Sequence, residues 1–255
     1  MIKLGLDIGS RNTKIVLYDT TISSISHYAW QSTDISARSS ALALIDSAFR
    51  INQLKAHDVS AIGVTGYGRK LMQDMGNAFS EISCHAVGCH FLFPGLRTII
   101  DVGGQDSKLI TLNEFGKVVD FAMNDKCAAG TGRFLEMTAL RLGCEVSQLS
   151  ALAAEAAQDL ILNSTCVVFA ESEIISLMAS STSAFDIAKA VHHSVVKRIQ
   201  AQMAGLDWTA PVCFTGGVAQ NSDLAYCLGN ALGHDLLIPP EPEITGALGA
   251  AILAR

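Results

Sequence analysis

The stretch DIGSRNTKIVL, residues 7–17, is repeated without a gap as DVGGQDSKLIT at residues 101–111. Each copy follows an apolar run and ends in a second one with β-branched residues, so each is predicted to form a strand, a glycine turn and a strand. A glycine close behind the strand aspartate lets backbone N–H groups approach phosphate oxygens. The aspartate itself can hold Mg²⁺ through water. Either turn alone is more typical of an ordinary hairpin, but the duplication predicts that both close on one nucleoside triphosphate.

Two further glycine motifs follow in the chain. In FTGGVAQN, residues 214–221, a strand runs into a Gly-Gly turn before a helical stretch at 220–232, and this exposed backbone is where adenosine is expected. In EITGALGAA, residues 243–251, two glycines stand at i and i+3 on one face of an expected helix, where small side chains permit close packing. We expect the last motif to form a hinge contact.

The order of these four elements resembles the actin, sugar kinase and heat-shock chaperone ATPase superfamily over essentially the full chain. The resemblance implies an α/β protein with a two-lobed, actin-like ATPase fold, made of ribonuclease H-like duplicated domains with the nucleotide in the cleft between them. We expect lobe I at residues 1–95, with a returning C-terminal helix at about 244–255. Lobe II is expected at residues 96–243, because Pro94 and Gly95 break the chain just before the second hairpin.

Length and composition limit the possible functions. A chain of 255 residues with 49% hydrophobic content can bury a large core in one or two domains. A net charge of -6 without a Lys/Arg cluster argues against a nucleic-acid partner. No uncharged apolar run approaches the ~20 residues of a membrane span. The first three residues lead straight into a strand and leave no room for a signal peptide, so we expect a cytoplasmic protein that does not bind membranes.

Hydrophobic periodicity and turn residues predict the remaining elements. Strands are expected at residues 24–30, 61–65 and around Val212. Helices are expected from Arg69 to near Gly76 and at residues 41–49, 82–93, 132–142, 150–158, 166–179 and 185–204. No low-complexity segment or long linker interrupts the chain, which favours mixed sheets covered by helices.

Two cysteines stand where nucleotide binding does not need them, Cys127 in NDKCAAGTG and Cys166 in NSTCVVFAESE. Each precedes or opens an expected helix, whose N-terminus carries unpaired N–H groups and a partial positive charge that favours a thiolate. A four-iron cluster takes four thiolates, so two per chain suffice if two chains meet on a symmetry axis. The spacing of the two cysteines matches no ligand signature, and free cysteines are usually small buried hydrophobes. Local sequence therefore leaves both interpretations open.

Five motifs resemble those of the ATP-dependent activators of 2-hydroxyacyl-CoA dehydratases, a family that includes the benzoyl-CoA reductase ATPase subunits: VTGYGR, IDVGGQDSK, MNDKCAAGTGRFLE, STCVVFAESE and FTGGVAQN. The resemblance implies a homodimer that holds one [4Fe-4S] cluster through two cysteines per subunit, here matching Cys127 and Cys166. It also implies that ATP binding and hydrolysis to ADP drive a low-potential electron into a partner dehydratase or reductase. A ferredoxin or flavodoxin is the implied electron donor. Residues 20–40 depart from the family pattern because they lack a clear glycine hairpin.

The expected MgATP ligands come from three motifs: Asp7, Gly9, Ser10, Thr13 and Lys14, then Asp101, Gly103, Gly104, Gln105 and Asp106, and finally Gly216 and Gly217 beside the adenosine. ATP hydrolysis needs an oriented water and neutralised charge at the γ-phosphate more than covalent chemistry. Gln105 is therefore the candidate for placing the water. Asp7 and Asp101 are the candidates for organising Mg²⁺.

The other cysteines indicate packing more than chemistry. Cys84-His85 and Cys89-His90 stand five residues apart and imitate half of a zinc site, but no second pair with ligand spacing follows. Only the first pair, within ISCHAVG, resembles the activator pattern. The remaining three cysteines lie in apolar or helical contexts and are expected in the core: Cys144, Cys213 and Cys227.

Other functions remain possible for the same sequence. A small-molecule kinase of this fold, such as an amino-sugar kinase, needs a sugar-binding insertion and an aspartate base, and 255 residues leave little length for the insertion. An actin-like assembly module would polymerise when ATP is added. The electron acceptor could also be a benzoyl-CoA reductase-type enzyme or a double-cubane-cluster reductase, because docking surfaces carry no short readable motif.

Overall fold

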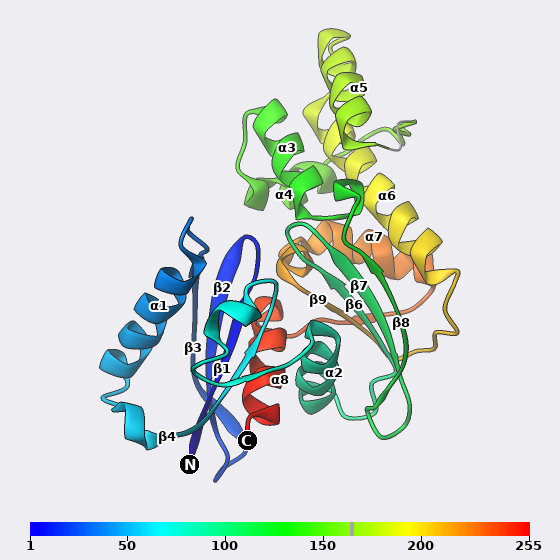
Figure 1. Ribbon diagram of the computed structural model, residues 1–255. Helices are drawn as coiled ribbons and strands as arrows, with labels where there is room; N and C mark the ends of the chain where they lie inside the picture. The colour runs from blue at the N-terminus through cyan, green and yellow to red at the C-terminus, as the bar shows by residue number, and fades with distance from the viewer. Residues whose placement is uncertain (164–165) are drawn as a thin grey trace. The chain divides into compact units, whose positions relative to one another are not determined.

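The computed structural model describes residues 1–163 and 166–255 (Figure 1). The chain divides into two compact units. Unit 1 comprises Met1–Ile99, Leu112–Val119 and Pro239–Arg255, and unit 2 comprises Ile100–Thr111 and Asp120–Ile238. Strands form two five-stranded sheets with helices packed against them, which confirms the predicted α/β class and the mixed sheets.

The sheet of unit 1 has the strand order β3-β2-β1-β4-β5. Its strands are β1 (Ile2–Ile8), β2 (Asn12–Asp19), β3 (Ser24–Ser32), β4 (Val59–Thr65) and β5 (Asn77–Ala78). The first three strands pair antiparallel, while β4 pairs parallel with β1. The predicted first hairpin is confirmed, and its register puts Asp7 opposite Lys14.

Helices cover both faces of this sheet, as Figure 1 shows. Helix α1 (Ala37–Ile51) packs on one face against Leu4, Leu6 and Ile8 of β1. Helix α8 (Thr245–Leu253) packs on the other face, next to α2 (Glu81–Leu92). Three short 3-10 helices complete the unit: η1 (Ala56–Asp58), η2 (Arg69–Met72) and η6 (Pro242–Ile244).

Helix α8 approaches the sheet and α2 unusually closely. A Cβ at Gly5 of β1 or at Gly63 of β4 would overlap backbone carbonyl oxygens of α8. A Cβ at Gly249 of α8 would overlap the carbonyl oxygen of Cys84 in α2. The predicted close packing of the last motif is therefore confirmed, and it depends on glycines in all three elements.

The second sheet has the strand order β10-β9-β6-β7-β8. Its strands are β6 (Thr98–Val102), β7 (Ser107–Leu112), β8 (Val118–Asn124), β9 (Val212–Thr215) and β10 (Leu236–Leu237). The second copy of the repeat thus forms two neighbouring strands around a glycine turn, as predicted. Strand β8 lies at the edge of the sheet and exposes Val119, Phe121 and Met123.

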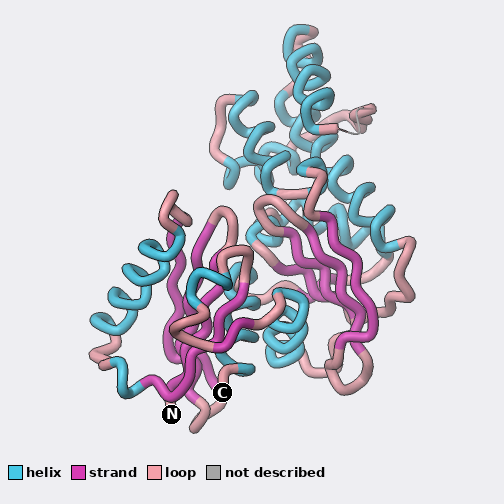
Figure 2. The backbone as a smooth tube through the Cα atoms, in the orientation of Figure 1, coloured by secondary structure: helices cyan, strands magenta, loops and turns pink. Residues whose placement is uncertain are grey.

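The helices of unit 2 are α3 (Gly132–Leu142), α4 (Leu149–Ala154), α5 (Val167–Ala179), α6 (Ala184–Met203) and α7 (Ser222–Leu232), with 3-10 helices η3 (Ala128–Gly130), η4 (Val146–Gln148) and η5 (Gly217–Gln220). In Figure 2, which has the orientation of Figure 1, α6 and α7 lie beside this sheet, and α3, α4 and α5 lie beyond its upper end. Helix α6 is the centre of the hydrophobic core, where Ile187, Val191 and Val195 pack with Phe134 of α3 and Phe214 of β9.

Two predicted helices were wrong in extent. The helix expected to reach Gly76 stops at Met72 as a 3-10 turn, and Gly76 then lies so close to β4 that a Cβ there would overlap the backbone of Ile62. The helix expected to reach residue 158 ends at Ala154. There the Asp186 carboxylate accepts the backbone N–H groups of two residues that a helix would otherwise have used, which stabilises a loop.

Within residues 1–163 and 166–255, no helix combines the length and apolar character needed to cross a bilayer.

Candidate functional site

The first glycine turn brings several of the predicted residues together at the end of β1. Asp7 is buried, with 6% of its surface exposed, and its Oδ2 lies 3.2 Å from Lys14 Nζ across the hairpin. The backbone N–H of Gly9 donates to the carbonyl of Asn12. Ser10 stands exposed at the tip of the turn. Buried Thr13 bonds through its hydroxyl to Thr33 and so supports the turn from behind.

The second turn repeats this arrangement at the end of β6. Asp101 is 3% exposed, and its Oδ2 lies 3.1 Å from Lys108 Nζ. Lys108 also reaches Asp106 Oδ2 at 2.8 Å, so this buried ammonium group has two carboxylate partners. The N–H of Gly103 donates to the carbonyl of Asp106, as in the first turn. Gln105 stands exposed at the tip.

Lys108 is a residue that the motif analysis missed. The repeat itself carried the signal, since Lys14 and Lys108 occupy the same place in the two copies. The structure places both ammonium groups beside the corresponding aspartate. Both turns therefore combine a buried carboxylate, a lysine and bare glycine backbone, a set that suits phosphate and magnesium binding.

The second turn is hydrogen-bonded to the start of α3. The N–H of Gly132 donates to the Gly103 carbonyl at 2.9 Å, and the N–H of Arg133 donates to the Gly104 carbonyl at 2.9 Å. Helix α3 follows directly on the η3 turn that begins after Cys127. A displacement of the second turn must therefore act on the segment that carries this cysteine.

The Gly-Gly motif after β9 packs against the same strand end. Gly216 has a φ of +85°, and a Cβ there would lie 2.7 Å from Asp101 Oδ1 and overlap the carbonyl of Val102. Gly217 begins η5, and the motif closes at Asn221, whose side chain accepts the N–H of Leu224 to cap α7. Unit 2 thus brings the second turn and the predicted adenosine motif together.

Both candidate cluster ligands are exposed thiols at the starts of helices. Cys127 is the residue before η3, and Asn124 fixes its backbone by donating to the Cys127 carbonyl at 2.8 Å and accepting its N–H at 3.0 Å. Cys166 is the residue before α5. Residues 164–165 of the STCVVFAESE motif lie outside the described part of the chain. Exposed Val168 and Phe169 follow Cys166 on α5 and leave an apolar surface beside it.

The other cysteines are packed in the interior or against it. Cys213 and Cys227 are buried and Cys144 packs against the core of unit 2, which confirms their predicted placement. Burial raises the pKa of the Cys84 thiol to about 12, and the nearby charge of Asp7 acts in the same direction. A protonated, buried thiol is a poor metal ligand. In the described residues, no three His, Cys, Asp or Glu side chains gather as a metal site.

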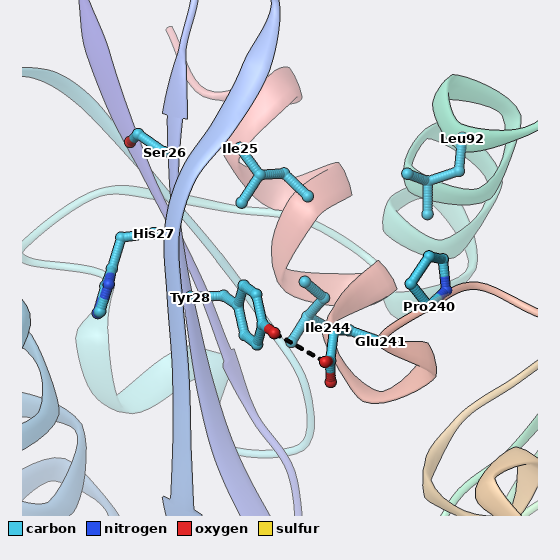
Figure 3. Close-up of a pocket in the computed structure, with 8 residues that line it drawn as sticks. All are labelled: Ile25, Ser26, His27, Tyr28, Leu92, Pro240, Glu241 and Ile244. Atoms are coloured by element: carbon cyan, nitrogen blue, oxygen red, sulfur yellow. Dashed lines mark hydrogen bonds between the residues drawn. The ribbon is translucent and has the colours of Figure 1, made fainter.

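Unit 1 also contains a cavity of about 430 Å³ that is separate from the predicted site residues (Figure 3). It is lined by Ile25, Ser26, His27, Tyr28, Leu92, Pro240, Glu241 and Ile244. The Tyr28 hydroxyl donates to Glu241 Oε1 at 2.7 Å, and this bond raises the pKa of Tyr28. In Figure 3 the His27 ring points away from the cavity. The lining is mostly apolar and contains none of the groups expected to bind phosphate.

The duplicated turns, with their paired aspartate and lysine on two mixed sheets, define an actin-like ATPase. The chain belongs to the BadF/BadG/BcrA/BcrD ATPase family, whose model matches residues 4–254. This confirms the family that the motifs indicated.

Individual relatives cover nearly the whole chain. The chain is 43% identical to the activator of lactoyl-CoA dehydratase of Anaerotignum propionicum, over 100% of this chain and 97% of that protein. It is 39% identical to the (R)-2-hydroxyglutaryl-CoA dehydratase activating ATPase of Acidaminococcus fermentans, over 98% of this chain and 96% of that protein. Among solved structures, the activator of the 2-hydroxyisocaproyl-CoA dehydratase from Clostridium difficile with bound ADPNP matches with a TM-score of 0.94. That match has 37% identity and covers 100% of this chain and 94% of the other.

Proposed function

We propose that this protein is an ATP-dependent activator that delivers low-potential electrons to a 2-hydroxyacyl-CoA dehydratase or a related reductase. The observation that carries the proposal is the pair of hydrogen bonds from the start of α3 to the second glycine turn, just after Cys127. These bonds connect a phosphate-binding element to a cysteine that an ordinary kinase does not need. Three relatives of similar length are named as dehydratase activators, which supports the same conclusion.

In this proposal the two turns serve one MgATP. The glycine backbone of both turns borders the phosphates: the N–H groups of Gly9 and Gly103 close their turns, and the N–H of Gly104 binds a phosphate oxygen. Ser10, Thr13 and Lys14 support the first turn. Asp7 and Asp101 organise Mg²⁺, Asp106 borders the MgATP at the second turn, and Gln105 orients the attacking water. Gly216 and Gly217 border the adenosine. The ADPNP in the solved relative supports a nucleotide as the ligand.

The cluster would be held by Cys127 and Cys166 of two chains. The residues fit this group, because both thiols are exposed, both precede helices, and neither makes a capping hydrogen bond with its side chain. Four such thiolates, two from each chain of a homodimer, match the usual ligand set of a [4Fe-4S] cluster. When bound, the cluster supplies one-electron transfer at low potential. The apolar side chains next to Cys166 fit contact with a second copy.

In this proposal, exchange between bound ATP and ADP changes the positions of the cluster cysteines through the hydrogen-bonded backbone of unit 2. Two backbone hydrogen bonds join the second turn to the start of α3, so a shift of one acts on the other, and Asn124 binds the backbone of Cys127 after β8. To shift a two-state population from 1:99 to 99:1, the nucleotide must prefer one state by about 5.5 kcal/mol. A ferredoxin or flavodoxin would supply the electron, and a dehydratase or reductase would receive it.

The test is the colour and iron content of cysteine variants purified without oxygen. Cys127→Ser and Cys166→Ser are expected to be colourless and nearly free of iron, because each removes two of the four proposed ligands from a dimer. Cys144→Ser is the matched control, since Cys144 packs against the core, and it should remain brown. A brown, redox-active Cys127→Ser protein would reject the ligand assignment.

A further inference from the structure

His85 is a buried titratable side chain that the proposed function does not use. It lies on α2 and is 6% exposed. Its Nδ1 atom is 3.0 Å from the hydroxyl oxygen of Thr245, the first residue of α8. A buried imidazole that bonds to one neighbouring element has a second nitrogen whose surroundings decide what else it does.

The other edge of the His85 ring and the Asp7 carboxylate both lie close to Gly246 of α8. A Cβ placed on Gly246 would lie 3.3 Å from His85 Nε2 and 3.2 Å from Asp7 Oδ2. The imidazole and the carboxylate therefore border the same small space over the α-carbon of Gly246. Because both atoms already stand closer than ordinary contact to that position, a larger residue than glycine would push the two side chains aside.

The hydrogen bond at Nδ1 bears on which nitrogen carries the proton. The Thr245 hydroxyl can donate to His85 Nδ1 at 3.0 Å or to the Pro242 carbonyl at 3.5 Å, and the shorter bond is the better one. When Thr245 donates to Nδ1, a neutral imidazole carries its proton on Nε2. This tautomer carries an N–H donor at Nε2, which borders the same space as Asp7 Oδ2.

Other neighbours limit the movement of the Asp7 carboxylate on its remaining sides. Lys14 Nζ lies 3.2 Å from Oδ2. A Cβ at Gly66 would overlap Oδ1, so this oxygen packs against bare backbone. Cys84, whose raised pKa reflects burial and the Asp7 charge, remains a neutral thiol. Asp7 is thus enclosed by β2, the turn after β4, α2 and α8.

We propose that His85 is a positioning residue for Asp7, in which Thr245 sets the imidazole tautomer and Nε2–H holds the carboxylate in the orientation that meets the magnesium of a bound nucleotide. This inference deepens the proposed nucleotide site and rests on it. The inference gives the ISCHAVG motif, residues 82–88, a role in nucleotide binding in place of zinc binding or simple packing. His85 does not contact the nucleotide in this scheme, and its effect is exerted through Asp7.

The expected consequence is a weaker response to magnesium. Loss of one hydrogen bond to a charged group should raise the Mg²⁺ concentration for half-maximal nucleotide binding by about tenfold. Saturating Mg²⁺ should return kcat toward the wild-type value, because the chemistry itself does not involve His85. A purely structural defect would lower the amount of folded protein without shifting the magnesium midpoint.

Two substitutions of His85 by amide residues distinguish the role of Nε2 from the role of Nδ1. In His85→Gln the amide nitrogen can reach the place of Nε2, so contact with Asp7 is retained. In His85→Asn the shorter side chain reaches only the place of Nδ1, so the bond to Thr245 is retained and contact with Asp7 is lost. The control is His90→Asn on the same helix, because the His90 ring lies against Gly116 and not Asp7.

The measurement is equilibrium binding of a fluorescent ATP analogue over a Mg²⁺ titration, with thermal unfolding of each variant alongside. We expect a near-normal midpoint for His85→Gln and His90→Asn, and a midpoint raised about tenfold for His85→Asn. Equal shifts in Gln and Asn variants, or a normal midpoint in a folded Asn variant, would overturn the inference. Thr245→Val gives a second readout that leaves His85 in place and should shift the midpoint in the same direction. Failure of the wild-type protein to bind the analogue would instead reject the proposed nucleotide site.

Discussion

His192 Nδ1 lies 2.6 Å from Asp223 Oδ2, and this buried pair joins the central helix α6 to α7. Lys189 of α6 reaches the other carboxylate oxygen at 2.7 Å. On the far side of the imidazole, the Asn221 side chain lies 2.9 Å from Nε2. Since Asn221 ends the Gly-Gly motif and caps α7, the network fixes the predicted adenosine motif to the core of unit 2.

This network predicts a loss of stability in acid. Burial raises the pKa of Asp223, but the hydrogen bonds from His192 and Lys189 outweigh it and lower the pKa to about 2. A carboxylate with a depressed pKa in the folded state stabilises the protein above its unfolded pKa of ~3.9, and this contribution is lost as the pH falls toward 2. Urea unfolding at pH 7, and at several pH values between about 4 and 2, should show this loss as a falling free energy of unfolding.

The matched variants are Asp223→Asn in the network and Asp46→Asn at an exposed position of α1. Asp223→Asn should lower the free energy of unfolding at pH 7 by about 3 kcal/mol, because Lys189 loses its charged partner. It should also flatten the acid dependence, whereas Asp46→Asn should leave both unchanged. Parallel pH profiles for wild type and Asp223→Asn would contradict the assignment.

The packing of α8 predicts a sharp cost for one added methyl group. Gly249→Ala would place a Cβ on the backbone of Cys84, and relief of the overlap requires α8 and α2 to separate. We expect a loss of about 3 kcal/mol in unfolding free energy. Gly205→Ala is the control, since a Cβ there would lie 3.9 Å from the Gln202 carbonyl, which is ordinary contact. If denaturant midpoints of the two variants agree, the close approach of α8 has no energetic importance.

Thiol reactivity should divide the cysteines into two groups. In cluster-free protein, exposed Cys127 and Cys166 should react rapidly with iodoacetamide near pH 8. Cys84 should stay unmodified, because it is fully buried and its pKa is raised to about 12. Peptide mass spectrometry after short exposure measures each site. Modification of Cys84 as fast as Cys166 in folded protein would show that α2 is not packed as described.

Gln105→Ala tests the role proposed for the tip of the second turn. The side chain is exposed and is proposed to orient the attacking water, so its loss should slow ATP turnover while nucleotide binding remains. Turnover and equilibrium binding should be measured on the same preparation. Unchanged hydrolysis would remove Gln105 from the mechanism.

Local sequence signals predicted the parts of the fold that depend on short-range patterns. The apolar runs on both sides of each glycine turn predicted the two hairpins of the repeat, and the helix at residues 132–142 appears with the predicted bounds. Strand β8 was not predicted, because its apolar side chains face solvent at a sheet edge and do not mark a buried face. The expected helix at residues 150–158 was cut short by Asp186, a contact about thirty residues away in sequence that no local pattern reveals.

The site residues that lie in local motifs were also predicted, and those that depend on long-range contacts were not. The glycine turns pointed to the aspartates beside them, and the structure brings Asp101, Asp106 and Gly216 together. Lys108 was overlooked although the repeat aligned it with Lys14. His85 was weighed only as a zinc ligand or core residue, because its contacts with Thr245 and the Asp7 region join segments distant in the chain. Such long-range contacts have no signature in one sequence.

The proposed electron-transfer role is tested most directly by iron, sulfide and molecular-mass analysis of protein purified and reconstituted without oxygen. A homodimer with about four iron and four sulfide ions per two chains is expected, and iron should be lost together with colour when either Cys127 or Cys166 is replaced. A monomer that remains free of iron after reconstitution would contradict the shared cluster and favour phosphorylation of a small molecule by the same fold.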